Sequence, residues 1–152
     1  MADSPSTGSA SWASSDAVRR SMQGNRSRDT MPELAVRKLL HRLGFRYRVA
    51  HRPLPQFRAT ADIVFPRQRV AIFIDGCFWH GCDEHYRPAA TNAEYWQSKI
   101  EHNIERDKRV TGVLLDAGWT VLRFWSHEAA EEVAVKVAEA VRPGLSVPTS
   151  TL

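Results

Sequence analysis

Residues 60–75, TADIVFPRQRVAIFID, hold two short apolar runs that are separated by the polar segment PRQR. Runs of this length that are rich in Val, Ile and Phe and bounded by a turn are typical of β-strands joined in a hairpin. The second run is almost wholly apolar, which indicates that its strand is the more buried of the two. This segment therefore predicts an antiparallel hairpin inside a β-sheet.

The segment before the hairpin predicts a helix followed by a strand. Thr30 and Glu33 have the spacing of a capping box, apolar residues recur after them at helical spacing, and Gly44 marks the end of the pattern. Residues 45–49, FRYRV, alternate between apolar and charged side chains. We therefore expect a helix over residues 30–44 and a half-buried strand at 45–49.

The segment after the hairpin predicts a helix, a strand and a further helix. Thr91 and Glu94 again have capping-box spacing, and we expect them to open a long helix that ends near Ala117. A fourth strand is expected at residues 119–125 and a last helix at 127–141. This order of elements predicts an α/β domain of three layers, in which helices flank both faces of a mixed β-sheet.

The length and composition of the chain fit one soluble domain. The chain has 152 residues, 43% of them hydrophobic, which is enough for a sizeable core. We expect a disordered serine-rich tail at 1–16, a single domain at 17–142 and a C-terminal tail at 143–152. No apolar run approaches the length of a membrane span, and the first residues lack the features of a secretory signal, so we expect a cytoplasmic protein.

The charge of the chain is compatible with a polyanionic partner. The formal net charge is +4, although many basic proteins bind no nucleic acid. Residues 17–29 are rich in arginine and include Arg19, Arg20 and Arg26. Such a segment is either a solvated linker or an arm that lies along a phosphate backbone. We favour the arm, because the segment directly precedes the folded domain.

Both cysteines of the chain lie directly after the hairpin. Cys77, Cys82 and His85 have the spacing C-x4-C-x2-H, and thiolates and imidazoles are preferred ligands of zinc. A structural zinc needs a fourth ligand, and His127 is the best candidate because a mixed sheet could bring the end of the fourth strand beside the end of the third. Two alternatives remain open: Asp83 replaces one of these ligands, or the cysteines are buried thiols without a metal.

Two aspartates lie in the apolar strands of the hairpin. An acidic side chain is costly in such a place unless it is paired or bound to a metal, and the hairpin could bring Asp62 and Asp75 close together. Two carboxylates at one site suggest Mg²⁺, which would stabilise negative charge on a phosphate during hydrolysis. The alternative is an edge strand on which Asp62 is solvated.

His80 lies between the two cysteines in the sequence. Once the zinc ligands are assigned, His80 is left over as a general base near the Mg²⁺ site, since imidazole can take up a proton near neutral pH. The alternative is that His80 is itself a zinc ligand in place of His85 or His127.

Large aromatic side chains flank these polar groups. Phe78 and Trp79 belong to the same loop, and Trp96 lies near the start of the long helix. Core packing is their ordinary role, but in a nuclease they could wedge between base pairs. Basic residues farther along the helix, including Lys99 and Arg106, could contact phosphates or simply face solvent.

Three segments carry the most specific pattern in the chain. They are FIDGCFWHGC at 73–82, TNAEYWQSKIEHNIERD at 91–107 and AGWTVLRFW at 117–125. Together they resemble the very short patch repair endonucleases, a family of bacterial DNA mismatch endonucleases. The resemblance covers about residues 19–127, and the combination of GCFWH with the N-x-x-R-D segment is highly specific.

The resemblance implies a restriction-endonuclease-like fold of the PD-(D/E)xK class. It implies an enzyme that recognises a T:G mismatch, produced by deamination of 5-methylcytosine, and nicks the strand 5′ of the mispaired T. Double-stranded DNA with such a mismatch is the expected substrate, with catalytic Mg²⁺ and structural Zn²⁺ as cofactors. Mismatch-repair proteins are candidate partners at the bacterial nucleoid, and we expect a monomer because a nick needs only one active site.

The resemblance also implies roles for single residues. It implies that Asp62 binds Mg²⁺ together with the backbone carbonyl of Ile74, that His80 is the general base and that Glu33 lies near the metal. The implied zinc ligands are Cys77, Cys82, His85 and His127. The implied intercalating residues are Phe78, Trp79 and Trp96.

The chain departs from the best-known members of that family at Ile74 and Asp75, where they carry Thr and His. The carbonyl of Ile74 can still bind a metal, and Asp75 could bind it directly, but an ionised Asp75 cannot donate a proton. The zinc ligands also differ, with Cys82 in place of His and two histidines in place of Cys. Two other interpretations stay open: a related restriction-type or damage-specific endonuclease, and a zinc-stabilised nucleic-acid-binding module without catalysis.

Overall fold

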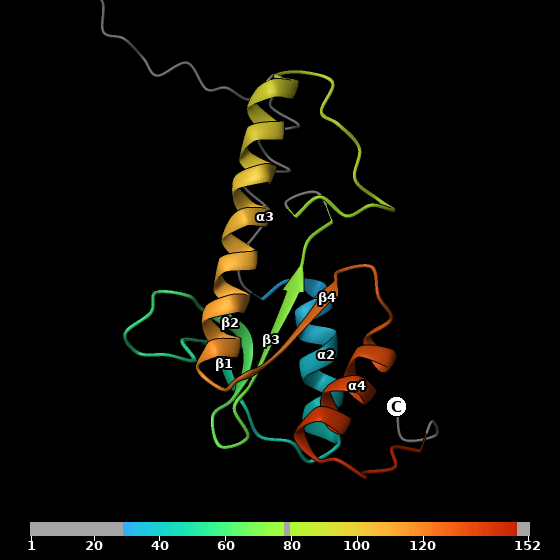
Figure 1. Cartoon of the computed structure of the whole chain (residues 1–152). Helices are drawn as coiled ribbons and strands as arrows, with labels where there is room; N and C mark the ends of the chain where they lie inside the picture. Colours follow the sequence, from blue (N-terminus) through green and yellow to red (C-terminus); the bar gives the residue numbers. More distant parts are fainter. Residues whose placement is uncertain (1–28, 78–79, 149–152) are drawn as a thin grey trace, which may run out of the picture.

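The computed structural model describes residues 29–77 and 80–148 (Figure 1). Within them the chain forms three helices and four strands: α2 (Met31–Arg42), β1 (Arg48–His51), β2 (Ala61–Phe65), β3 (Val70–Asp75), α3 (Ala93–Asp116), β4 (Thr120–Trp125) and α4 (Ala130–Val141). The order of elements is the predicted one. None of the described helices is long and apolar enough to cross a membrane.

The four strands form one mixed sheet in the order β1-β2-β3-β4. β2 pairs antiparallel with both β1 and β3, whereas β3 and β4 run parallel. The predicted hairpin is the β2–β3 unit, with Ile63 opposite Ile72 and a turn at residues 66–69. Because β1 and β4 flank it, the hairpin is the centre of the sheet and neither of its strands is an edge.

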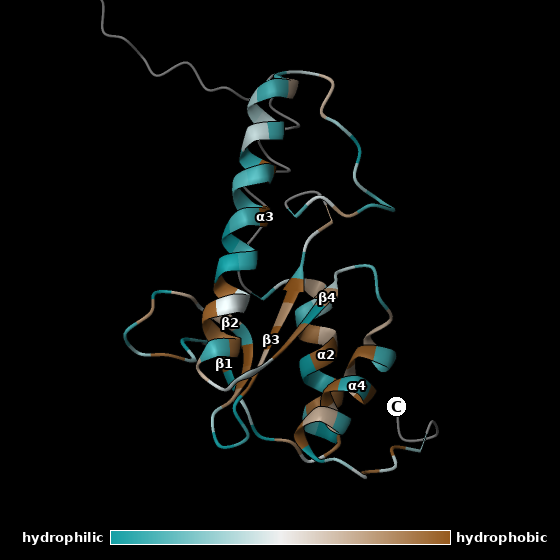
Figure 2. Cartoon of the chain, viewed as in Figure 1, coloured by the Kyte–Doolittle hydropathy of each residue, from teal (hydrophilic) through white to brown (hydrophobic). Residues whose placement is uncertain are grey.

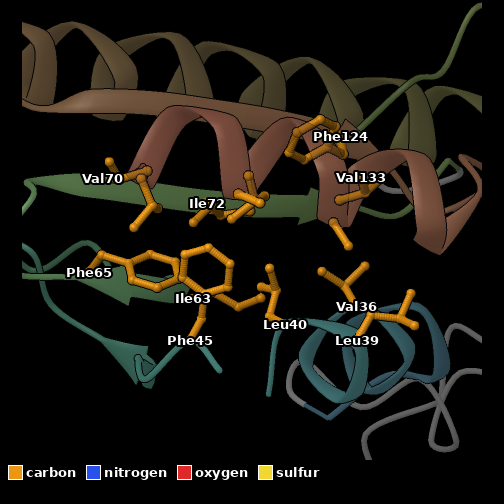
Figure 3. Packing of buried hydrophobic residues seen from close by; sticks show 14 residues of the cluster. Val36, Leu39, Leu40, Phe45, Ile63, Phe65, Val70, Ile72, Phe124 and Val133 are labelled. Carbon is orange, nitrogen blue, oxygen red and sulfur yellow. The ribbon is translucent and has the colours of Figure 1, made fainter. Parts of the chain in front are cut away.

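One face of the sheet packs against α2 and α4, as Figure 3 shows. Leu40 of α2 and Val133 of α4 meet Ile63, Ile72 and Phe124 of the strands. Each of these five side chains is at most 5% exposed. Removing this much apolar surface from water is the main force that holds the two helices on the sheet.

The opposite face of the sheet packs against α3. Val110 and Leu114, near the C-terminal end of this helix, contact Val64, Ala71 and Phe73. Figure 2 shows hydrophobic residues among polar ones at this end of α3, whereas most of the helix is hydrophilic and extends beyond the sheet. Helices on both faces confirm the predicted α/β architecture.

The first strand begins later than predicted, at Arg48 rather than at residue 45. Phe45 is 2% exposed, and its N–H donates to the carbonyl of Leu40 at 3.0 Å. Its ring also lies edge-on to Phe65, with 6.0 Å between ring centroids. Phe45 therefore anchors the turn after α2 in the core, and the chain becomes extended only after it.

The long helix does not start with the predicted capping box. It begins at Ala93, and its N-cap is Asn92 in the left-handed conformation with φ 56°, without a side-chain cap hydrogen bond. Thr91 therefore lies outside the helix, and its predicted role is wrong. Asn is one of the few residues that adopt this conformation readily, which explains why the helix starts one residue later.

Candidate active site and metal cluster

A cavity of about 730 Å³ lies between the ends of β2 and β3, the adjoining part of α3 and the first turn of α2. Charged and titratable groups that line it come from Glu33, Asp62, Asp75, His80, Asp107, Arg58, Arg106 and Arg123. The cavity thus collects all four residues that were predicted to be catalytic: Glu33, Asp62, Asp75 and His80. The backbone of Ile74, a predicted metal ligand, also lines it.

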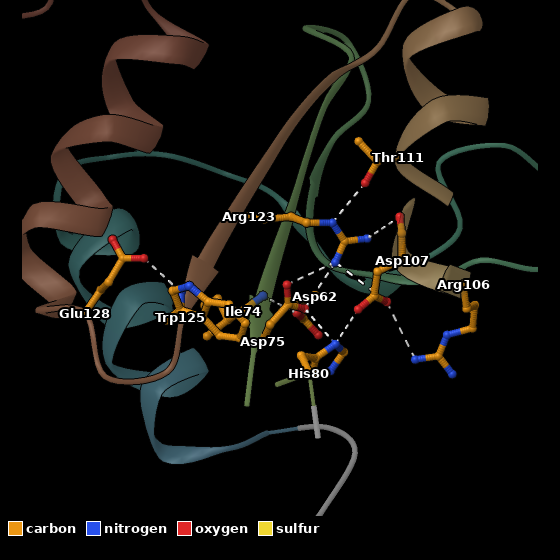
Figure 4. A network of polar contacts seen from close by, with 10 residues as sticks. All are labelled: Asp62, Ile74, Asp75, His80, Arg106, Asp107, Thr111, Arg123, Trp125 and Glu128. Atoms are coloured by element: carbon orange, nitrogen blue, oxygen red, sulfur yellow. Dashed lines mark hydrogen bonds and ion pairs between the residues drawn. The ribbon is translucent and has the colours of Figure 1, made fainter. Parts of the chain in front are cut away.

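Asp62 is the second residue of β2, and Figure 4 shows it beside the end of β3. Its Oδ2 accepts a hydrogen bond of 2.7 Å from the backbone N–H of Ile74. Burial raises the pKa of Asp62 from 3.8 to about 7, against the effect of this N–H, and the charges of Glu33 and Asp75 add to the rise. Asp62 and Asp75 line the same cavity, in agreement with the prediction that the hairpin brings them close together, and the solvated-edge alternative is wrong because β2 is an internal strand.

Glu33 lies in the first turn of α2 and is 4% exposed. Its carboxylate accepts hydrogen bonds from the backbone N–H of Asp29 and from the hydroxyl of Thr30, each of 3.0 Å. Asp29 in turn forms an ion pair of 2.7 Å with Arg37. The capping-box spacing therefore anchors Glu33 to the chain before the helix, although Thr30 makes no side-chain cap bond to the helix.

Asp75 is the last residue of β3 and forms an ion pair with Arg123 on β4. Nη1 of Arg123 lies 3.1 Å from each of the two carboxylate oxygens of Asp75. Burial raises the pKa of Asp75, and the positive charges of His80 and Arg123 oppose the rise. A role of Asp75 as a metal ligand stays a prediction, and the contact with Arg123 competes with it.

His80 lies between two carboxylates. Its Nδ1 forms a hydrogen bond with the carboxylate of Asp107 on α3 and lies 3.7 Å from Oδ1 of Asp75. Burial alone would raise the pKa of Asp107, but the hydrogen bond and charge of His80, together with nearby arginines, lower it. His80 groups with these carboxylates rather than with the cysteines, so the structure does not support its alternative role as a zinc ligand.

Gly81 allows the loop after β3 to pass close to α3. Its φ is +65°, and a Cβ at this position would lie 3.2 Å from side-chain atoms of both Ile100 and Ile104. Only glycine combines this backbone conformation with so close an approach. The neighbouring His80 is thereby brought to the side of the helix on which Asp107 lies.

The four predicted zinc ligands, Cys77, Cys82, His85 and His127, form one cluster. Their ligand atoms all lie within 4.8 Å of one another. Nδ1 of His127 is 3.2 Å from Sγ of Cys77 and 3.7 Å from Sγ of Cys82. Two thiols and two imidazoles at such spacing suit tetrahedral coordination by zinc, with bonds of about 2.0–2.3 Å. Asp83 is exposed and is not a member of the cluster.

The parallel pairing of β3 and β4 explains how His127 reaches the cysteines. Asp75 is opposite Trp125 in the strand register. The backbone N–H of Ser126 donates to the carbonyl of Asp75 at 2.9 Å, and Ser126 also lies 3.5 Å from Sγ of Cys77. The prediction that the fourth strand ends beside the third is confirmed.

The residues predicted to contact DNA are only partly described. Phe78, Trp79, Arg19, Arg20 and Arg26 lie outside the described residues. Trp96 is 4% exposed, so its burial does not support its predicted role as a wedge in this conformation. Lys99 is exposed, with its ammonium 5.8 Å from the ring centroid of Tyr95, and Arg106 is exposed at the cavity.

Two residues of the cavity, Asp107 and Arg123, were given no role from the sequence. Arg123 is a charged residue inside the strand TVLRFW, the same signal that pointed to Asp62. Asp107 precedes Val110 by three positions and Leu114 by seven, so helical spacing puts it on the face that packs on the sheet. The first signal, a charge inside an apolar strand, could have identified Arg123 from the sequence, and the second, helical spacing, could have identified Asp107.

Comparisons with known proteins agree on one family. The family described as DNA mismatch endonuclease Vsr matches residues 14–86. Type II nicking enzyme V.NaeI of Lentzea aerocolonigenes is 45% identical over 122 residues, which are 79% of this chain and 74% of that protein. Type II nicking enzyme V.NmeDIP of Neisseria meningitidis serogroup C is 44% identical over 129 residues, 82% of this chain and 85% of that protein.

A further relative carries the name of the family itself. DNA mismatch endonuclease Vsr of Escherichia coli (strain K12) is 36% identical over 107 residues, which are 70% of this chain and 67% of that protein. Carboxylates and an imidazole in one cavity are groups that hydrolysis of a phosphodiester uses. The chain is therefore a DNA endonuclease of the nicking type, and it belongs to the DNA mismatch endonuclease Vsr family.

Proposed function

We propose that the protein nicks one strand of double-stranded DNA 5′ of the mispaired T in a T:G mismatch and so starts very short patch repair of deaminated 5-methylcytosine. The name of the Escherichia coli relative supports a mismatch as the target. The observation that carries the proposal is the buried Asp62 in the same cavity as the His80–Asp107 pair. We further propose a restriction-endonuclease-like fold, action as a monomer, and mismatch-repair proteins as partners.

The carboxylates of the cavity suit a cation that prefers oxygen ligands, such as Mg²⁺. Within the described residues, the N–H of Ile74 is the one hydrogen-bond donor to Asp62, which leaves the second carboxylate oxygen for a ligand. The pKa of Asp62, raised to about 7 by burial, reflects a cost of ionisation that a divalent cation would offset. Asp62 and the carbonyl of Ile74 would hold the ion, with Glu33 acting through water. Bound Mg²⁺ would stabilise charge on the scissile phosphate.

His80 is our candidate for the general base. When Nδ1 donates to Asp107, the other ring nitrogen is an acceptor that can take a proton from the attacking water. The carboxylate of Asp107 would then fix the orientation of the ring and stabilise the imidazolium that forms. This arrangement assigns proton transfer to residues of the β3–α3 loop and α3, and charge stabilisation to the Asp62 side of the cavity.

We propose that the cluster of Cys77, Cys82, His85 and His127 holds a structural zinc ion. The cluster joins the loop after β3 to the end of β4, and His80 lies in sequence between its two cysteines. A metal there would fix the loop that presents His80 to the cavity. Phe78 and Trp79 belong to the same loop, and we propose that they unstack bases at the mismatch.

Nicking of end-labelled duplexes tests the proposed activity. The purified protein is incubated with Mg²⁺ and a panel of duplexes that carry one T:G mismatch in different flanking sequences, including a CC(A/T)GG-like context. Fully paired duplexes of the same sequences are the controls. We expect a single nick 5′ of the mispaired T, dependent on Mg²⁺, absent from the paired duplexes and lost in Asp62→Asn.

Each other outcome favours a different activity. Cutting of mismatched and paired duplexes alike would indicate a related endonuclease with another target. Binding of the whole panel without cutting, in the presence of Mg²⁺, would contradict the proposal and indicate a nucleic-acid-binding module.

A further inference from the structure

Arg123 is a partly buried cation in the middle of an otherwise nearly apolar strand, β4. Its side chain is 22% exposed. The guanidinium carbon lies 4.2 Å from the ring centroid of Phe73, the residue opposite it on β3. The cation is therefore packed on the face of the sheet that α3 covers, beside the cavity.

The guanidinium of Arg123 bonds to two different elements, as Figure 4 shows. On α3, Nε donates to Oγ1 of Thr111 at 2.9 Å, and Nη2 donates to the backbone carbonyl of Asp107 at 3.3 Å. On β3, Nη1 lies 3.1 Å from both oxygens of Asp75. A planar group with donors in several directions can join helix and strand in this way, whereas a lysine ammonium cannot reach all three partners.

His80 lies between the two carboxylates that Arg123 contacts. Nδ1 of His80 bonds to Asp107 and lies 3.7 Å from Asp75, and Nη1 of Arg123 lies 3.8 Å from Oδ1 of Asp107. A displacement of the guanidinium would therefore move both neighbours of the imidazole. Within the described part of the chain, no hydrogen bond joins Arg123 directly to His80, so any influence on that ring passes through the carboxylates.

Asp75 and Asp62 differ in what they can offer to a cation. Both oxygens of Asp75 already contact a guanidinium. Asp62 accepts one hydrogen bond among the described residues, from the N–H of Ile74. A divalent cation beside Asp75 would be repelled by Arg123 at close range. Beside Asp62 it would be attracted by carboxylates, because His80 balances their negative charge only in part.

We propose that Arg123 is a positioning residue of the nicking reaction and that Asp75 is its internal counter-ion rather than a ligand of the catalytic metal. The pair fixes the distance between β3 and α3, and with it the place of His80 between Asp75 and Asp107. The kinetic part of this inference rests on the proposed function, but the coupling of the two residues does not.

A double-mutant cycle in thermal unfolding tests the coupling without any substrate. Arg123→Met and Asp75→Asn should each lower Tm by about 5 °C, because each leaves a partly buried charge without its partner. The double variant should lose about 5 °C as well, rather than about 10 °C, since it leaves neither charge behind. Arg67→Met, in the exposed β2–β3 turn, is the control and should leave Tm unchanged. Additive losses in the double variant would overturn the proposed pair.

Metal binding to the protein as purified tests the role of Asp75. Mn²⁺ is titrated into each variant, and free Mn²⁺ is followed by electron paramagnetic resonance. Asp75→Asn should keep the Kd of the wild-type protein within about threefold, whereas Asp62→Asn should raise it by about tenfold or more. Equal weakening by the two substitutions would make Asp75 a ligand and would overturn this half of the inference.

Single-turnover nicking tests the positioning role. Arg123→Met should slow the chemical step by about tenfold to a hundredfold and change the Kd for mismatched DNA by less than about threefold. Arg123→Lys keeps the charge but reaches fewer partners, so it should be intermediate, and it provides the test if the methionine variant does not fold. A wild-type rate in a folded Arg123 variant would overturn the positioning role. An inactive wild-type protein would overturn the proposed function, while the unfolding cycle would still decide the coupling.

Discussion

Replacing Asp62 by asparagine should raise the free energy of unfolding of the protein at alkaline pH when no Mg²⁺ is bound. In the folded protein the pKa of Asp62 is raised by burial from 3.8 to about 7, so the folded state binds a proton more tightly than the unfolded chain does. The contribution of Asp62 to stability is therefore fully present below about pH 3.8 and is lost as the pH rises to about 7. Asparagine does not ionise, and it can still accept the N–H of Ile74.

The size of the effect follows from the shift in pKa. A rise from 3.8 to about 7 corresponds to at most about 4 kcal/mol over the whole range, at about 1.4 kcal/mol per unit. About 2.5 kcal/mol of this falls between pH 5 and pH 8.5. The side chain borders an open cavity and is partly screened by water, which reduces the effect. We therefore expect the free energy of unfolding of Asp62→Asn, relative to that of wild type, to rise by about 1–2.5 kcal/mol between pH 5 and pH 8.5.

Urea unfolding followed by tryptophan fluorescence at pH 5 and pH 8.5 measures this gain. The buffer contains neither Mg²⁺ nor a chelator, so that a bound zinc ion is kept. Asp116→Asn, at the exposed C-terminal end of α3, is the control and should change stability equally at both pH values. The reasoning is refuted if Asp62→Asn is no more stabilising at pH 8.5 than at pH 5. We also expect this variant to lose nicking, so that one substitution separates stability from activity.

Three further predictions concern the other parts of the site. His85→Ala removes an exposed member of the thiol and imidazole cluster, and mass spectrometry of the purified variant should find less than about half a zinc ion per chain. One zinc ion per chain in this variant would contradict the proposed ligand set. His80→Ala should slow single-turnover nicking by about 10²-fold or more and Asp107→Asn by about tenfold or more, with little change in DNA affinity. Rates close to wild type would exclude His80 as a general base that the carboxylate of Asp107 orients. Arg106→Ala should weaken binding to paired and mismatched DNA alike, and in fluorescence anisotropy it should lower the slope of log K against log salt by about 1, whereas Arg67→Ala should change neither. An unchanged slope would show that Arg106 does not contact a phosphate.

The hairpin and its neighbours could be predicted because their signals are local. The apolar runs at 60–65 and 70–75 specify β2 and β3, and the polar turn between them leaves only antiparallel pairing. The ends of elements were harder, since they depend on packing that the sequence does not display. Phe45 fits an alternating strand pattern, yet its burial beside Phe65 makes it part of a turn.

The candidate site was predicted where residues of unusual character stand close in sequence. Cys77, Cys82 and His85 share one loop, and Asp62 is conspicuous in an apolar strand. Asp107 is harder to find, because the ERDKR segment of α3 is charged on every side and only the later apolar residues reveal its inner face. The pairing of Asp75 with Arg123 depends on the parallel register of β3 and β4, which no local pattern encodes.

The two clusters of the site are parts of one structural unit, because the same two strand ends supply both. β3 ends at Asp75 and leads into the loop with Cys77, and the parallel strand β4 ends at Trp125, two residues before His127. A metal held by these ends would tie the loop to the strand ends of the sheet, while Gly81 brings the same loop against α3. The imidazole of His80 between these two anchors therefore has little freedom to move. It follows that loss of the metal should affect the chemical step of nicking, through His80, more than it affects the apolar core.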